Sequence, residues 1–278
     1  MLCLDPRAEG RRYSLYGSRP GPRLNEPLSV PPPVKAPTGK KKMSGPKNEV
    51  RDDGLTIVRI IGPLEQRSMA HGECAGWGDG HDAIADRLID AFELGNVVLV
   101  VDSPGGAHAG LQEAIKRVAK VKKEKGRRVV AYADEMIGSA AYWWVACVSD
   151  EIYGPESMIV GSIGARSAHC SEAGALKKQG REVTYFAAPG PGKVAFAPEF
   201  PLSPLGKERG ERDTWIAFEA FAKDVGKARG LSRKQIVALD ADALPGALAV
   251  KAGLVDGIAS LDEVLEMEIA LVAKGTQV

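Results

Sequence analysis

The sequence predicts an α/β fold with a mostly parallel sheet and a C-terminal helical segment. Three observations carry this prediction. Short β-branched segments alternate with segments of helical periodicity, as in βαβ units. Residues 96–102 (NVVLVVD) form a continuous apolar run, which is typical of a strand covered on both faces. Long helical patterns fill the chain after residue 205. With 278 residues, 44% of them hydrophobic, the chain can bury a substantial core.

The individual elements follow from local patterns. Leu55–Ile61 (LTIVRII) is rich in β-branched residues and predicts the first strand. The spacing of Ile84, Leu88 and Phe92 predicts a helix over residues 82–94. RVVAYA (128–133) and EVTYFA (182–187) predict further strands. The remaining helices are expected at about residues 109–125, 138–148, 205–229, 232–239, 246–252 and 260–273.

Residues 1–50 have a different composition from the rest. They hold nine of the eighteen prolines and the run Lys40-Lys41-Lys42. Such a segment cannot bury enough apolar surface to offset its ordering entropy, so we expect a disordered head over 1–50 and one folded domain over 51–278. The head carries ten Lys/Arg and four Asp/Glu, so its formal net charge is +6. Residues 51–278 carry 27 Lys/Arg and 32 Asp/Glu, so their formal net charge is −5. A mildly acidic domain is not expected to bind nucleic acid.

Composition also bears on location and cofactors. No apolar run reaches the roughly 18 residues that a membrane-spanning helix needs. The first residues lack the apolar segment of a secretory signal, so we expect a soluble, cytoplasmic protein without a membrane span. The four cysteines contain no C-x-x-C pair, so we expect no metal site. We expect the protein to work in a reducing compartment.

The first candidate site is the segment Asp102-Ser103-Pro104-Gly105-Gly106. It lies where a buried strand ends and a helix begins, the edge at which open α/β sheets bind ligands. Two glycines there can present backbone N–H groups to a phosphate or to a developing oxyanion. The alternative is an ordinary strand-to-helix turn. Because GxGxxG and P-loop patterns are both absent, a nucleotide site is disfavoured.

The second candidate is Ser139 in Gly138-Ser139-Ala140-Ala141-Tyr142. Small neighbours leave room for a substrate carbonyl, and a helix N-terminus favours negative charge on the serine oxygen. The alternative is a serine that only caps the helix. A third small-residue segment, VGSIGA (160–165), follows another short predicted strand and by itself indicates a turn.

These segments occur together and in a defined order. VDSPGG is followed by GSAAYWWVACVSDEIYGPESMIVGSIGA, and the chain closes with ARGLSRKQIVALDADALPGALAVKAGLVDGIASLDEVL. In this it resembles the signal peptide peptidase A family of serine–lysine peptidases over roughly residues 55–268. The resemblance implies a Clp/crotonase-like fold of repeated ββα units, hydrolysis of peptide bonds in protein substrates without a cofactor, and a ring-shaped homo-oligomer. With one motif set and no membrane anchor, the chain looks most like the soluble phage members that act as prohead or scaffold proteases in a bacterial host, and it also resembles the short bacterial members.

The resemblance assigns the catalytic roles. Ser139 would be the nucleophile, and the oxyanion would bind the N–H of Gly105 or Gly106 together with that of Ala140. The base would be Lys193, acting in its own subunit or in a neighbour.

The loop that carries Lys193, residues 188–198 and here called the lysine loop, matches the family only in part. Lys193 keeps the preceding glycine and a proline five positions on, but Ala195 and Phe196 stand where an acidic residue and a glycine usually follow. A lysine acts as a base only when neutral, which requires surroundings that lower its pKa from about 10.4. The alternative for Lys193 is an ordinary solvent-exposed loop lysine.

Other bases and other functions stay open. His169, after VGSIGA, is the rival base in a Clp-like Ser–His pair, and His108 ranks behind it. The altered lysine loop also fits a structural or scaffold homologue that has lost catalysis. A crotonase-like acyl-CoA hydratase or isomerase is a further alternative, and the sequence shows no obvious catalytic acid near the SPGG or GSAAY segments in its favour.

Overall fold

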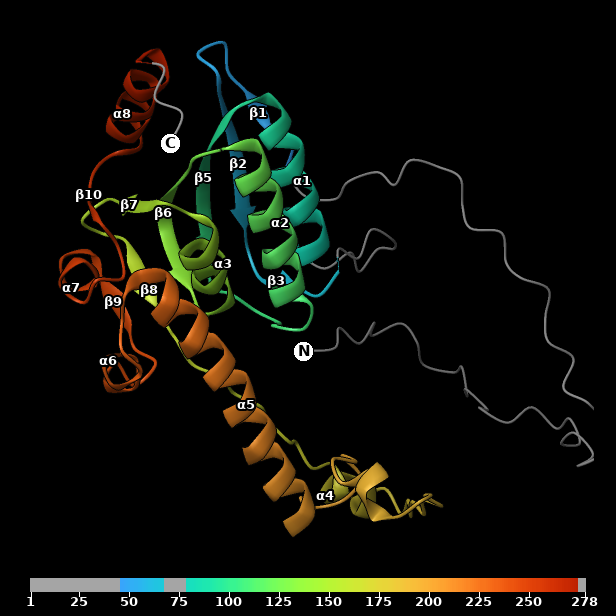
Figure 1. Ribbon diagram of the computed structural model, residues 1–278. Coiled ribbons are helices and arrows are strands. Elements are labelled where there is room, and N and C mark those ends of the chain that lie inside the picture. Colours follow the sequence, from blue (N-terminus) through green and yellow to red (C-terminus); the bar gives the residue numbers. More distant parts are fainter. Residues whose placement is uncertain (1–45, 68–78, 275–278) are drawn as a thin grey trace, which may run out of the picture. The chain divides into compact units, whose positions relative to one another are not determined.

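The computed structural model describes residues 46–67 and 79–274, and their centre is a mostly parallel sheet (Figure 1). The strand order is β1-β2-β5-β6-β7-β10, and β8 pairs with both β6 and β9. All pairings among these strands are parallel except β1 with β2 and β8 with β9. The strands of this sheet are β1 Glu49–Val50, β2 Leu55–Ile61, β5 Asn96–Ser103, β6 Val129–Gly138, β7 Glu151–Gly154, β8 Ile159–Gly161, β9 Ala243–Pro245 and β10 Gly257–Ile258.

A second, two-stranded sheet pairs β3 (Leu64–Glu65) with β4 (Asp79–Gly80) in parallel. The helical elements are α1 His81–Leu94, α2 Leu111–Lys125, α3 Ala140–Val148, α4 Ala173–Lys178, the 3-10 turn η1 Pro191–Val194, α5 Pro204–Arg229, α6 Arg233–Ala238, α7 Gly246–Lys251 and α8 Leu261–Ala273.

The two faces of the main sheet are covered by different helices. Because side chains alternate along a strand, Val58 and Ile60 of β2 point into the core formed with α1, α2 and α3. Leu55 and Ile57 of the same strand face a second core, where Val264 of α8 packs. Burial on both faces explains the continuous apolar run of β5. The α/β fold with a mostly parallel sheet and a C-terminal helical segment is therefore confirmed.

Strand β6 pairs with two different strands along its length, β7 first and β8 at its end. Its first half pairs with β7 at residues 130–132, and its last residues, 136–138, pair with β8. The ends of β6 and β8 therefore lie side by side, with Gly138 opposite Gly161. Helix α3 begins directly after β6, while the turn after β5 lies on the other side of β6.

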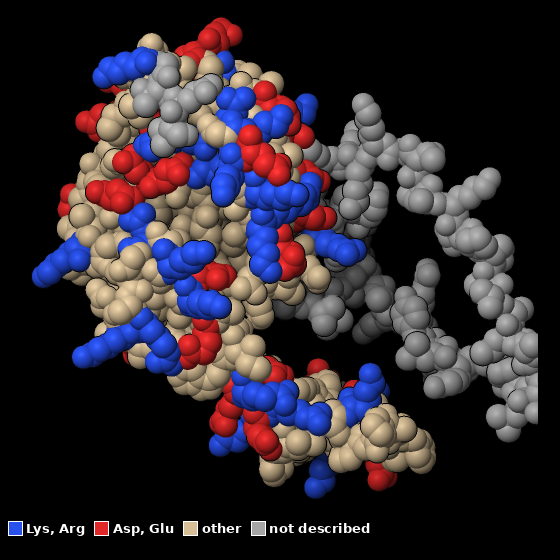
Figure 2. All heavy atoms as spheres, in the orientation of Figure 1, with Lys and Arg blue, Asp and Glu red and all other residues tan. Residues whose placement is uncertain are grey.

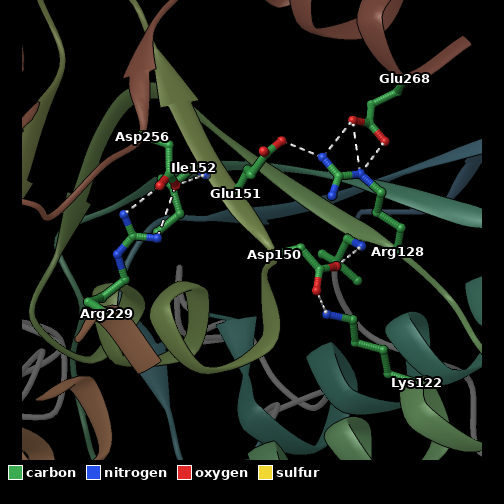
Figure 3. A network of polar contacts seen from close by, with 9 residues as sticks. Lys122, Arg128, Asp150, Glu151, Ile152, Arg229, Asp256 and Glu268 are labelled. Carbon is green, nitrogen blue, oxygen red and sulfur yellow. Dashed lines mark hydrogen bonds and ion pairs between the residues drawn. The ribbon is translucent and has the colours of Figure 1, made fainter. Parts of the chain in front are cut away.

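Polar contacts fix the helices to the β7 end of the sheet (Figure 3). Arg128 binds Glu268 of α8 and Glu151 of β7. Asp150 accepts from Lys122 of α2 at 2.7 Å and from the N–H of Val129 at 2.8 Å. In the same way the Asp256 carboxylate joins Arg229, at the end of α5, to the N–H of Ile152. Residues from distant parts of the chain thus meet at one end of the sheet.

Helix α5 runs from the body toward the segment that contains α4 and η1 (Figure 1). Its C-terminal part packs on α3, where the rings of Trp143 and Phe221 stack at 4.7 Å. Asp224 accepts from Trp143 Nε1 at 3.0 Å and from Gln112 of α2 at 2.9 Å. Within the described residues, no helix is both long enough and apolar enough to cross a membrane.

Most predicted elements are present within a few residues, but the strand predicted at 182–187 is wrong. That stretch has no strand partner among the described residues and is largely exposed. Phe186 is 97% exposed, and Tyr185 packs edge-on against Phe200 instead. Strand-like composition does not produce a strand where no sheet edge is within reach. The predicted head lies outside the described residues except for 46–50, of which Glu49 and Val50 pair with β2 as β1.

Candidate active site

Ser139 joins β6 to α3 in a strained backbone conformation. Its φ is 50° and its ψ is −122°, a region that non-glycine residues rarely adopt. Such strain costs about 1–3 kcal/mol and concentrates at functional sites. The side chain makes no capping hydrogen bond, so the cap alternative is wrong. Ser139 is half-buried, and its Oγ has no hydrogen-bond partner among the described residues, which leaves it free for chemistry.

The SPGG turn is held in place by backbone and side-chain bonds. Ser103, which is fully buried, donates from Oγ to Gly62 O at 2.6 Å and accepts the Gly105 N–H at 3.1 Å. Leu64 donates to Gly105 O at 2.9 Å, and Ala107 donates to Leu64 O at 2.8 Å. The N–H of Gly105 is therefore already used.

The N–H of Gly106 has no acceptor among the described residues. Leu64 passes so close that a Cβ at position 106 would lie 2.1 Å from Leu64 O, so only glycine fits there. Ala140 is the first residue of α3, and its N–H likewise has no acceptor in the described part of the chain.

The two sequence motifs meet in space. A Cβ built on Gly105 would lie 2.7 Å from Ala140 N and 2.7 Å from Ser139 Cβ, so the SPGG turn touches the start of α3. Ser139 donates its own N–H to Gly161 O at 2.8 Å, which ties it to the end of β8. The nucleophile candidate, two unpaired N–H groups and the positive end of α3 thus converge.

A groove of about 1530 Å³ opens from Ser139. The SPGG turn, the start of α3, the chain after β8 and one face of α5 line it. Trp143 and Phe221 form an apolar wall near Ser139. Ser162 also lines the groove, with a strained φ of 55°, although its segment by itself predicts only a plain turn.

The loop of Lys193 contacts the N-terminal part of α5, whereas α3, which begins after Ser139, packs against the C-terminal part. Lys193 lies exposed in η1, and its neighbour Gly192 accepts from Arg209 Nη1 at 2.9 Å. Arg209 and Phe221, which stacks on Trp143 of α3, are twelve residues apart on α5, about 18 Å of helix rise. Lys193 does not line the groove, whereas Phe196 and Pro198 of the same loop do.

Neither candidate histidine pairs with Ser139. His169 lines the groove and has Nε2 3.1 Å from Phe200 O. His108 is exposed at the rim beside the SPGG turn. Among the described residues, no group of three His, Cys, Asp or Glu side chains could hold a metal ion.

The structure adds one residue that sequence reasoning missed. His81, the first residue of α1, is 1% exposed and bonds to both the SPGG loop and α3. A single histidine at a helix start carries no sequence signal for such a position.

The chain is similar to several known proteins. Residues 121–273 match the family described as Peptidase family S49. The chain is 29% identical to the capsid assembly protease C of Escherichia phage lambda over 80% of its length and 50% of that protein. It is 28% identical to a putative signal peptide peptidase SppA of Enterococcus faecium over 61% of its length and 49% of that protein. The chain thus spans about half the length of these relatives.

Among solved structures, a mutant of ClpP1 from Listeria monocytogenes matches with a TM-score of 0.45 and 15% identity, over 75% of this chain and 92% of that one. The family match covers more than half of the chain and contains both Ser139 and Lys193. With the motifs of the SPGG turn and the α3 start in contact, the chain belongs to peptidase family S49.

Proposed function

We propose that this protein is a serine endopeptidase in which Ser139 attacks the peptide carbonyl of an unfolded or scaffold-type protein substrate. The observation that carries the proposal is the strained Ser139, with an unbonded Oγ, at the N-terminus of α3 and against the SPGG turn. Strain of this kind presents a nucleophile at a fixed angle. Membership of peptidase family S49 supports the reaction class.

The oxyanion of the tetrahedral intermediate would bind the N–H groups of Gly106 and Ala140. Gly105 is the weaker candidate because its N–H already donates to Ser103. Two preorganised donors stabilise charge that develops only in the transition state, and one such donor is worth about 3–4 kcal/mol in other serine peptidases.

Lys193 would serve as the base from a neighbouring subunit. Lys193 does not line the groove that opens from Ser139, and its side chain is exposed for contact with another copy. Neutral Nζ takes the Ser139 proton as the C–O bond forms. The resulting ammonium then protonates the amine that leaves, and water later hydrolyses the acyl-enzyme by the same route.

This arrangement requires a homo-oligomer, which we propose to be a ring. The likeness to capsid assembly protease C supports a capsid-scaffold substrate and action inside a prohead or the cytoplasm of a bacterial host. The mixed surface charge supports a protein rather than a nucleic-acid partner, because Lys/Arg and Asp/Glu side chains are interspersed on the face seen in Figure 2.

A fluorophosphonate probe and an unfolded protein substrate test the nucleophile. We expect the parent chain to be labelled at Ser139 and to cleave, and Ser139→Ala to do neither while keeping its oligomeric state. Lys193→Met and Lys193→Arg should both be inactive, because methionine has no amine and a guanidinium stays protonated. An unlabelled Ser139 with a correctly folded parent would contradict the proposal.

Coexpression of the two inactive chains tests the shared site. Ser139→Ala and Lys193→Met chains together should regain part of the parent rate, since some interfaces then join an intact serine to an intact lysine. His169→Ala is the comparison for the rival base. If it abolishes cleavage while Lys193→Met keeps the parent rate, a Ser–His site replaces the Ser–Lys site.

A second function has one observation in its favour. Lys193 is exposed, and its loop departs from the family pattern at Ala195 and Phe196. Those features fit a structural homologue without catalysis. In that case Ser139 would stay unlabelled in an assembled oligomer.

A further inference from the structure

His81 connects the two halves of the candidate oxyanion site. Its Nδ1 lies 3.0 Å from Trp144 Nε1, and its Nε2 lies 2.6 Å from the carbonyl oxygen of Ala107. Ala107 directly follows Gly106 in the loop, and Trp144 lies one turn along α3 from Ala140. His81 and Trp144 are both fully enclosed, with 1% and 0% exposure.

The partners define the protonation state of the ring. An indole nitrogen only donates, so Nδ1 of His81 must accept from Trp144. A carbonyl only accepts, so Nε2 must carry the proton and donate to Ala107. Both bonds are made together only by the neutral imidazole with its proton on Nε2. An imidazolium would turn a second N–H toward the Trp144 N–H.

The backbone that carries His81 is also held in place. Asp79, two residues earlier, forms a buried ion pair with Arg87 of α1, with 3.0 Å between Arg87 Nη1 and Asp79 Oδ1. Asp79 also donates its N–H to Pro63 O at 2.9 Å, beside the strand that crosses Gly106. The imidazole therefore projects from a rigid support.

We propose that His81 is a positioning residue that holds the loop of Gly106 against helix α3, and that it does so only as the neutral Nε2–H tautomer. It does not touch the substrate. It acts through the Ala107 carbonyl on one side and the Trp144 indole on the other. The proposal rests on the proposed peptidase function for its catalytic consequence, but the coupling itself is a property of the folded chain.

The two hydrogen bonds of His81, to Ala107 and from Trp144, depend on pH because of the surroundings of the ring. Burial lowers the pKa of His81 below its ordinary 6.5, while the Ala107 bond and the charges of Asp79, Asp82 and Glu65 act in the opposite direction. Because the pKa is lower in the folded chain, the unfolded chain binds the proton first. Both hydrogen bonds are therefore complete above about pH 6.5 and are lost as the pH falls toward the pKa of His81 in the folded chain.

Hydrogen exchange of the full chain tests the coupling without any need for activity. His81→Phe keeps an aromatic ring but removes both bonds, and should speed amide exchange in the peptide spanning residues 104–110 by about tenfold or more. Tyr142→Phe is the matched control. It removes an equally buried bond from α3, from Tyr142 Oη to Leu254 O at 2.8 Å, on a side away from the loop. Exchange in that loop should then equal that of the parent.

Kinetics of the same variants test the catalytic consequence. His81→Phe should lower kcat by about tenfold to a hundredfold with KM within about threefold, since the donors shift but the groove remains. His81→Gln can still donate to Ala107 and should recover most of kcat. Trp144→Phe should raise the pKa of His81, seen in the ¹⁵N shifts of histidine-labelled protein, because a neutral Nδ1 loses its donor.

These experiments distinguish a failure of the positioning role of His81 from a failure of the proposed peptidase function. If His81→Phe and Tyr142→Phe give the same loop exchange, or if the ¹⁵N shifts of the parent report an Nδ1–H tautomer, the positioning role is wrong. If loop exchange responds as expected but the parent cleaves nothing, the coupling stands and the proposed function fails alone. Should His81→Phe not fold, the exchange and ¹⁵N measurements on His81→Gln and Trp144→Phe decide the same question.

Discussion

A side chain at position 105 would collide with the start of α3. A Cβ there lies 2.6 Å from Gly138 O and 2.7 Å from Ala140 N, and φ is 88°, which L-residues avoid. Ser139 shows the complementary case, because a non-glycine residue keeps a positive φ of 50° there. At this scale the site depends on two backbone conformations: one that requires glycine, and one that the surrounding contacts impose on serine.

Substitution at Gly105 should show how closely the site is packed. Gly105→Ala should lose about 1–2 kcal/mol of stability to backbone strain and about 1–3 kcal/mol more to overpacking. It should also lose fluorophosphonate labelling of Ser139. Gly126→Ala is the control, since φ there is 58° but nothing lies within 4 Å of the added Cβ. Thermal unfolding measures both, and equal losses would mean that Gly105 is not tightly packed.

Helix α8 illustrates the scale of single elements. It begins at a capping box formed by Ser260 and Glu263 and covers the sheet face opposite α3. Its Glu268 side chain is only 4% exposed and pairs with Arg128, which also binds Glu151 (Figure 3). The helix is thus fixed both by apolar packing around Val264 and by one enclosed ion pair.

Removal of that carboxylate should loosen the helix. Glu268→Ala leaves the largely buried Arg128 with Glu151 alone, so we expect a loss of about 1–3 kcal/mol in the free energy of unfolding. Glu266→Ala, on the exposed side of the same helix, should change it by less than about 0.5 kcal/mol. Urea denaturation checks the pair. Equal midpoints for the two variants would show that the ion pair contributes nothing.

At the scale of the whole molecule, α5 carries apolar side chains that the described chain does not cover. Trp215 and Ile216 are 57% and 62% exposed. They lie between the anchored end of α5 at Phe221 and the lysine loop at its other end. Our proposal of a shared Ser–Lys site requires subunit contacts in this region, so these side chains are the natural contacts.

Assembly and activity should therefore fall together. Trp215→Ala with Ile216→Ala should lower the sedimentation coefficient and reduce cleavage more than about tenfold, since a central tryptophan commonly dominates an interface. Leu248→Ala, 50% exposed on α7, is the control for loss of an exposed apolar side chain. Full activity in a monomeric double variant would refute the shared site.

The boundary of the folded domain is also testable. A chain that starts at Met43 retains Glu49 and Val50, which pair with β2, and should stay folded and active. Brief trypsin treatment of the full chain should cut within residues 1–42 before it cuts the body. Aggregation of the shortened chain would place part of the core in the head.

Local patterns determined most of the framework. The β-branched run of β2, the apolar run of β5 and the amphipathic pattern of α1 are fixed by residues close in sequence, so their bounds agree with the prediction within one or two residues. The predicted strand at 182–187 failed because pairing depends on a distant edge. The short strands β3, β4, β9 and β10 were not predicted, since two or three residues form no recognisable period.

The sequence by itself determined the fold class, the family and the motifs that include Ser139 and the SPGG turn. Only the tertiary structure decided which N–H groups are left unpaired among the described residues, because Ser103 takes that of Gly105 and leaves that of Gly106. It also placed Lys193 outside the lining of the groove at Ser139 and joined His81 to both sides of the site. Short patterns report local conformation, whereas contacts between residues far apart in the chain exist only after folding.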